Sequence, residues 1–151
     1  MDWAFDIAIK NRKLLDSFIE NHTLEELNKV PEGFNNNIIW NIAHTIVTQQ
    51  LLVYNLSGLP MLLSEEMVAA YRKGTKTERD VSQDEVNLVK GLLFSTIEKT
   101  KADYDCKNFQ SYIEYTVSTK STLSNVEEAI DFNNFHEGIH LGYILALRKS
   151  L

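Results

Sequence analysis

Residues Asn35 to Gly58, NNNIIWNIAHTIVTQQLLVYNLSG, carry the clearest structural signal in the sequence. Its opening asparagines are candidate helix N-caps, and its closing glycine is a helix stop signal. Between these signals apolar residues recur on two stripes, one through Ile38 and Ile42 and the other through Trp40. A helix that is apolar nearly all round needs more than one neighbour to cover it. The stretch therefore predicts a long helix at the centre of a helical bundle.

Three further segments show the spacing of an amphipathic helix, with apolar residues at every third or fourth position. They cover residues 2–20, Ser82 to about Tyr104, and Ser124 to Arg148. Ser82 and Ser124 are each followed three residues later by Glu, the capping box that begins a helix. Shorter helical segments are expected at residues 23–27 and 64–71. For residues 112–122, where strand-favouring residues alternate with small polar ones, we expect a loop with some extended character.

These segments predict an all-α fold: a four-helix bundle with a crossover connection, plus short extra helices. The chain has 151 residues but only two prolines and six glycines. These are too few turn-forming residues for the many tight turns of a β-sandwich or barrel. The length is typical of one domain with one buried core. We therefore expect residues 1–151 to form a single helical domain.

Charge and composition exclude several classes of function. Fifteen Lys and Arg against 21 Asp and Glu give a net charge of −6 with the signs interspersed, so there is no basic stripe for nucleic acid. The single cysteine, Cys106, leaves no partner for an intrachain disulfide or a cysteine zinc site. No apolar run approaches the ~18 residues of a membrane span. Asp2 and Asp6 interrupt the N-terminus as they would not in a signal peptide. We expect a cytoplasmic protein without nucleic-acid or membrane partners.

Three of the four histidines lie on predicted helices where they are expected to face the bundle interior. His136 and His140 are four residues apart, which places them on one helix face about 6 Å apart along the axis. His44 lies on the apolar central helix. Histidines on facing helices are one way in which a bundle builds a metal site. His22 lies in a polar break between helices and is expected to be solvated.

A histidine on an apolar face is also commonly a hydrogen-bonded core residue, and this alternative stays open for each position. Burying three unpaired imidazoles would cost about 1–3 kcal/mol each, a cost that a shared divalent ion removes. Zinc, nickel or iron would each suit imidazole. Asn41 and Asn133 both precede a histidine by three residues. Each could orient a ring through its second nitrogen, or could serve only in capping or solvation.

The pentapeptide His136-Glu137-Gly138-Ile139-His140 also matches the zinc-protease pattern H-E-x-x-H. The extended form of that pattern fails, because Tyr143 stands where its glycine belongs and Ala146 where its third histidine belongs. Only eleven residues follow His140, too few to supply a distant third ligand. We therefore interpret the match as accidental and Glu137 as a solvated or interhelical carboxylate.

Two segments resemble the two motifs of the DinB-like superfamily: Trp40-Asn41-Ile42-Ala43-His44, and the run from His136 to Ile144. The similarity extends over essentially the whole chain, including the short middle helix before the Lys73-Gly74-Thr75 loop. The resemblance implies a four-helix bundle with a crossover, a three-histidine divalent-metal site and frequently a homodimer. Family members with known chemistry include transferases and isomerases that use low-molecular-weight thiols. Tyr143 stands where members often have Gln, so the contribution of that position to the site is expected to differ.

Two kinds of function are compatible with these observations. The first is a metal-dependent enzyme with His44, His136 and His140 as ligands, which acts on a small molecule by thiol transfer or hydrolysis; its catalytic acid or base cannot be named. The alternative is a dimeric metal-binding or stress-response module without turnover. We also expect a homodimer because Trp3, Phe5 and Ile7 give the first helix more apolar surface than one core-facing stripe requires.

Overall fold

The computed structural model describes all 151 residues and is all-α apart from one small hairpin. The long helices are α1 (Asp2–Glu20), α3 (Ile38–Val53), α5 (Gln83–Asp105) and α6 (Val126–Leu147). The short helices are α2 (Leu24–Asn28) and α4 (Glu65–Tyr71), with 3-10 turns η1 (Asn55–Ser57) and η2 (Arg148–Ser150). Strands β1 (Tyr115–Thr116) and β2 (Thr122–Leu123) pair antiparallel.

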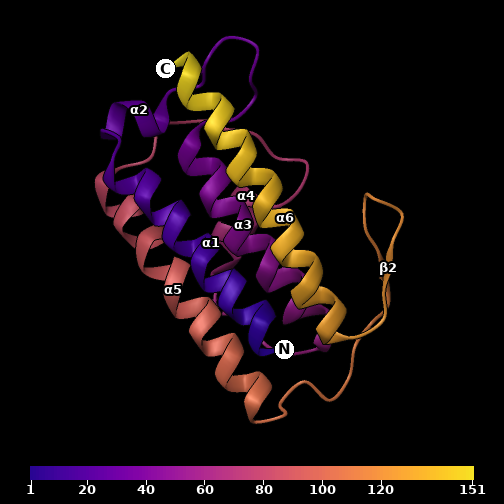
Figure 1. Cartoon of the computed structure of the whole chain (residues 1–151). Coiled ribbons are helices and arrows are strands. Elements are labelled where there is room, and N and C mark those ends of the chain that lie inside the picture. The colour runs from indigo at the N-terminus through magenta and orange to yellow at the C-terminus, as the bar shows by residue number, and fades with distance from the viewer.

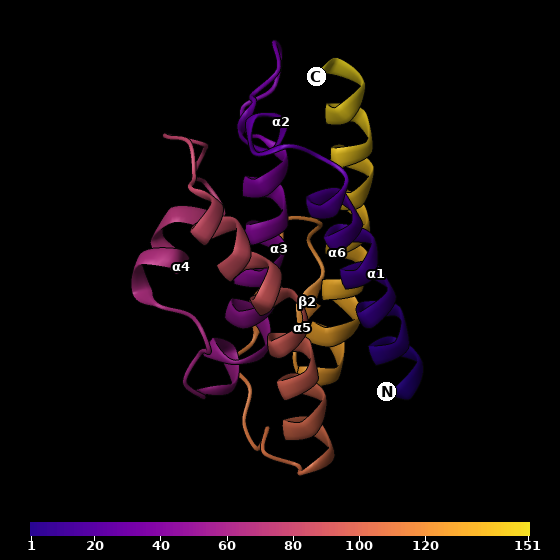
Figure 2. The same cartoon turned by 90° about the vertical axis from the view of Figure 1, so that its left-hand side faces the viewer.

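The four long helices form a bundle in which α1 and α6 run in one direction and α3 and α5 in the other (Figure 1). Because α3 and α5 are parallel, the chain between them must return along the length of the bundle. That crossover contains α4, which lies outside α3 (Figure 2). The fold class predicted from the sequence, a four-helix bundle with a crossover and short extra helices, is confirmed.

Helix α3 is the central element, as its apolar pattern predicts. Every residue in it except Thr48 and Leu51 is buried. It packs against α6, α5, α4 and α1, with the most extensive contact to α6. Asn37 caps its N-terminus by accepting the backbone N–H of Trp40, and Gly58 ends the following turn in the left-handed conformation, with φ of +70°. The packing of α3 against α6 is what brings the histidine segments together.

The capping box at Ser82 is present as predicted, and Thr23 forms another at the start of α2; in each the Glu side chain accepts from the backbone N–H of the cap residue. The prediction of a cap at Ser124 is wrong by one residue. Asn125 caps α6 by accepting the backbone N–H of Glu128. The Ser124 N–H instead donates to the Glu128 carboxylate.

The buried stripe of α6 also differs from the one predicted. Phe135, Ile139 and Tyr143 are 53%, 51% and 37% exposed, whereas Glu137 is fully buried. The stripe is rotated because the buried guanidinium of Arg12 on α1 pairs with Glu137. The exposed apolar surface of α1 is also smaller than expected, because Phe5 is buried. Trp3 is exposed as expected, at 75%.

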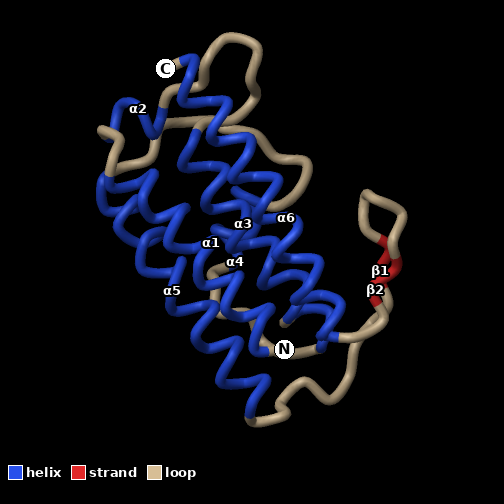
Figure 3. Tube along the Cα trace, in the orientation of Figure 1, coloured by secondary structure: helices blue, strands red, loops and turns tan.

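The hairpin of β1 and β2 lies to one side of the helices (Figure 3). It falls at residues 115–123, where the sequence indicated a loop with extended character. None of the helices combines the length and the apolar character needed to cross a membrane.

Candidate metal centre

The three interior histidines meet between α3 and α6. His44 comes from the middle of α3, and His136 and His140 come from successive turns of α6. Their ring centroids are 5.1 Å apart for His44 and His136, 4.8 Å for His44 and His140, and 4.5 Å for His136 and His140. One ring nitrogen from each lies within 4.8 Å of the other two. The structure thus places together the three residues that the sequence nominated as metal ligands.

Hydrogen bonds fix the tautomers of two of the rings. The Nδ1 of His44 lies 2.6 Å from the carbonyl oxygen of Tyr71, which can only accept, so Nδ1 carries the proton. The Nδ1 of His140 lies 2.8 Å from Oδ1 of Asn41, whose amide nitrogen is occupied by the carbonyl of Asn37. In both rings Nε2 is therefore the unprotonated nitrogen that can bind a cation. In His44 this nitrogen also accepts from the Thr48 hydroxyl at 3.3 Å.

The histidines are held neutral by their surroundings. Burial lowers the pKa of His136 to about 3, and the electrostatic influence of His140, His44 and Arg12, which disfavours a positive charge on this ring, lowers it further. Burial and the proximity of His44 lower the pKa of His140 to about 4. The pKa of His44 is also lowered by burial, against an opposing effect of its hydrogen bond to Tyr71. Neutral imidazole is the form that binds metal.

One ring nitrogen in the cluster has no partner in the protein. The Nδ1 of His136 is buried and makes no hydrogen bond. A buried polar atom of this kind is unusual in a folded protein. Three neutral imidazoles, no carboxylate in the cluster and one orphaned nitrogen fit a divalent cation such as zinc, nickel or iron.

The cluster opens into a cavity of about 290 Å³. His44 and His140 lie in its wall, beside Trp40, Asn41 and Tyr143. The loop after α4 covers the opposite side with Lys73, Gly74 and Thr75. Gly74 has φ of +92°, a conformation that favours glycine and allows the loop to turn there. A small molecule could therefore reach the histidines, which a closed structural site would not allow.

The two predicted orienting residues lie in different places. Asn41 accepts from His140, as expected of a residue that fixes a ring. Asn133 makes no hydrogen bond to a histidine; its amide nitrogen donates to Oε1 of Glu137 at 2.9 Å. Glu137 is the interhelical carboxylate that the sequence suggested, and it is paired with Arg12 rather than free to act as a base.

Two other candidates lie outside the cluster. His22 stands between α1 and α2, where its Nδ1 donates to the carbonyl of Phe18. Cys106 is exposed at the end of α5 and lines neither described cavity.

Trp40 and Tyr71 also contribute to the site, although the sequence did not predict a role for either. The indole of Trp40 stacks on the His44 ring at 4.7 Å with the planes 10° apart. Its spacing, one helical turn before His44, was a usable signal. Tyr71 contributes through its backbone carbonyl, and no side-chain pattern could have indicated that. Tyr143 lines the cavity and packs edge-on against Phe34, with centroids 5.4 Å apart.

Residues 8–144 match the model of the family described as the DinB superfamily. That range includes the whole of α3 and α5, most of α1 and α6, and the three clustered histidines. No curated protein matches the chain.

Proposed function

The chain belongs to the DinB superfamily, and from this membership and the geometry of the site we propose that it is a metal-dependent enzyme acting on a small molecule by thiol transfer or hydrolysis. The observation that carries the proposal is the cluster of three neutral imidazoles, two of which, His44 and His140, line an open cavity. His44, His136 and His140 are the proposed ligands. A three-histidine site leaves a coordination position open, as catalytic sites do.

The chain's own residues prepare this site. Tyr71 and Asn41 hold two rings with Nε2 unprotonated, and Trp40 stacks against His44 and limits its rotation. A divalent ion held here would lower the pKa of a thiol or water bound to it and so supply a nucleophile at neutral pH. Lys73 and Tyr143 stand in the cavity wall, where they can contact a substrate. The proposed thiol is a low-molecular-weight cosubstrate, since Cys106 is not at the site.

One observation favours the alternative of a binding module without turnover. No carboxylate lines the cavity beside the histidines, and Glu137 is neutralised by Arg12. A general base would then have to come from the substrate or the thiol. The enzyme proposal is preferred because the cavity gives a small molecule access to the cluster.

Metal content is the first test. Protein purified without a metal-affinity step should carry about one divalent ion per chain by elemental analysis. His136→Ala and His140→Ala should lose it, whereas His22→Ala, a histidine outside the cluster, should keep it. Stoichiometric metal retained in both cluster variants would contradict the ligand assignment.

Metal removal tests whether the ion is functional rather than structural. A chain of this size, with a large hydrophobic core, should remain folded without an ion. We expect His44→Ala to lower the metal affinity at least about tenfold. Neither this substitution nor removal of the metal by a chelator should change the helical circular dichroism signal appreciably. Both should abolish any transfer or hydrolytic activity found by screening. Unfolding on chelation, or activity in metal-free protein, would contradict the proposal.

A further inference from the structure

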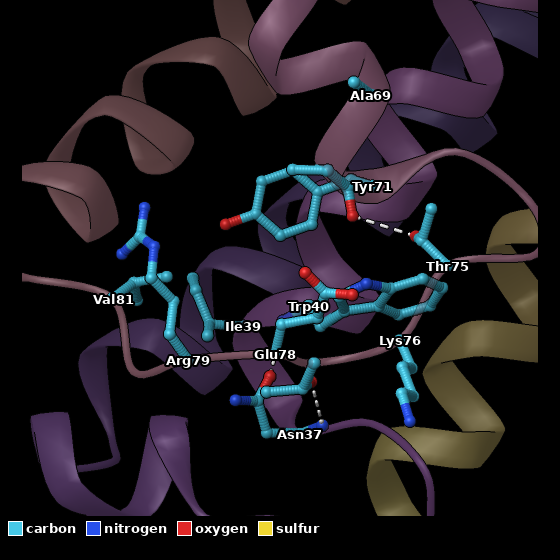
Figure 4. A pocket seen from close by; sticks show the side chains of 12 residues that line it. Asn37, Ile39, Trp40, Ala69, Tyr71, Thr75, Lys76, Glu78, Arg79 and Val81 are labelled. Atoms are coloured by element: carbon cyan, nitrogen blue, oxygen red, sulfur yellow. Dashed lines mark hydrogen bonds between the residues drawn. The ribbon is translucent and has the colours of Figure 1, made fainter.

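A second cavity, of about 370 Å³, lies beside the histidine cavity (Figure 4). Its wall includes apolar and aromatic side chains from α3 and α4, among them Ile39 and Tyr71, and polar side chains from the loop that follows α4. Trp40 and Thr75 line both cavities. The two spaces therefore adjoin at the indole that stacks on His44.

The indole nitrogen of Trp40 has no hydrogen-bond partner in the protein. The side chain is only 7% exposed, and Nε1 itself is buried. Buried indole N–H groups normally find an acceptor. In Figure 4 the nitrogen lies on the edge of the ring that faces Tyr71, across the second cavity. An acceptor on a molecule in that cavity would satisfy it.

The loop along both cavities is basic in a chain whose net charge is −6. Lys73 lines the histidine cavity and Lys76 the second one, and neither forms a salt bridge. Arg79 also lines the second cavity, but it is held by Glu85 at 2.5 Å. Glu78 is the one carboxylate in either wall. Each cavity wall thus contains one lysine without an ion pair, and the wall of the histidine cavity contains no carboxylate.

We propose that the two cavities form one groove for an anionic small molecule. Its carboxylate or phosphate lies beside Lys73 and Lys76, and its reacting end faces the histidines. Its remaining part occupies the second cavity between Tyr71 and Trp40, where an acceptor atom takes the Trp40 N–H. The inference rests on the proposed function only in placing the reacting end at the histidines.

Trp40 can report on occupancy of the groove. The chain has two tryptophans, and Trp3 is exposed on α1 and lines neither cavity. In the Trp3→Phe variant, fluorescence comes from Trp40 alone. We would titrate this variant, metal-free and metal-loaded, with 3-phenylpropionate, phenyl phosphate and the neutral 3-phenylpropionamide. The first two probes distinguish a carboxylate site from a phosphate site, and the amide measures the contribution of charge.

We expect saturable changes in Trp40 emission with at least one anionic probe. The affinity for the neutral amide should be at least about tenfold weaker than the affinity for that anion. Adding Lys73→Ala and Lys76→Ala should weaken anion binding about tenfold and leave amide binding unchanged. The matched control, Lys13→Ala with Lys149→Ala, removes the same charge from exposed positions away from the groove and should bind as the parent does.

Calorimetry of Trp40→Phe, which keeps an aromatic ring but removes the N–H, should show weaker binding of the same probe. Binding in metal-free protein supports the groove even if the metal assignment fails, since metal content is measured separately on the same samples. No saturable binding in either form, or equal affinity for anion and amide, would overturn the inference. The inference would also be overturned if the control variant at Lys13 and Lys149 lost as much affinity for the anion as the variant at Lys73 and Lys76.

Discussion

Arg12 and Glu137 place opposite charges inside the bundle with neither side chain exposed to water. Oε1 of Glu137 accepts from Nε of Arg12 at 2.8 Å and lies 2.7 Å from Nη2, and Asn133 donates to the same oxygen. The pair joins α1 to α6 at the residue next to His136. It therefore fixes the rotation of α6 that turns His136 and His140 toward α3.

Removing one partner of this pair should be far more costly than removing both. Arg12→Met or Glu137→Gln alone should lower the free energy of unfolding by about 3–5 kcal/mol, because the remaining group is left buried without its partner. Arg12→Met combined with Glu137→Leu should recover most of that loss. Urea denaturation of the three variants measures the difference. A double variant as unstable as either single one would show that the pair is not the cause.

The clustered histidines should make the metal-free protein sensitive to mild acid. Their pKa values are about 3 for His136 and about 4 for His140, below the ordinary histidine value of 6.5. From about pH 6.5 down to about pH 4.5 the unfolded chain therefore binds protons that the folded chain does not, and stability falls as the pH falls. Carboxylates such as Glu85, whose pKa the Arg79 hydrogen bond lowers to about 2, lose their contribution only below this window.

The measurement is the Tm of metal-free protein at about pH 7.5 and about pH 5, the two sides of the histidine window. We expect a lower Tm at the acidic value, and a smaller difference in His136→Gln with His140→Gln. An unchanged or higher Tm at about pH 5 would mean that the histidines are protonated in the fold.

At the scale of single elements, the N-terminus of α6 offers a test of local capping. Asn125 caps the helix through its side chain, whereas Ser124 contributes only its backbone N–H. Asn125→Ala should therefore cost about 1 kcal/mol, and Ser124→Ala no more than about 0.5 kcal/mol. Chemical denaturation of the two variants provides a matched comparison. If both variants lost the same free energy of unfolding, Ser124 and Asn125 would contribute equally to the cap.

The same helix shows what sequence patterns can and cannot predict. The long helices, their caps and the inward histidines follow from local spacing, and so were predictable. At α6 the local signals are degenerate, because Ser124 and Asn125 are both good caps with Glu three residues later. The burial of Glu137 depends on Arg12, 125 residues away, which no local pattern contains. The Tyr71 carbonyl and the second cavity likewise arise only when the crossover lies against α3.

At the scale of the whole molecule, α1 and α6 leave an apolar surface uncovered. Trp3 is 75% exposed, and Phe135 and Ile139 are each about half exposed. The amide of Asn134 donates to the carbonyl of Ala4, which brings Trp3 and Phe135 onto neighbouring turns of the two helices. Phe5 is buried and adds nothing to this surface, contrary to the expectation from its position.

We propose that two copies of the chain associate through the exposed side of α1 and α6, because large exposed apolar groups on a small protein often mark an association surface. Light scattering over a hundredfold dilution from high micromolar should give the mass of a dimer. Trp3→Ser with Phe135→Ser should shift the mass toward the monomer. Leu88→Ser, which removes a 58% exposed apolar residue from α5, should not. A monomer mass at every concentration would contradict the proposal, and loss of the dimer in Leu88→Ser alone would place the interface on α5 instead.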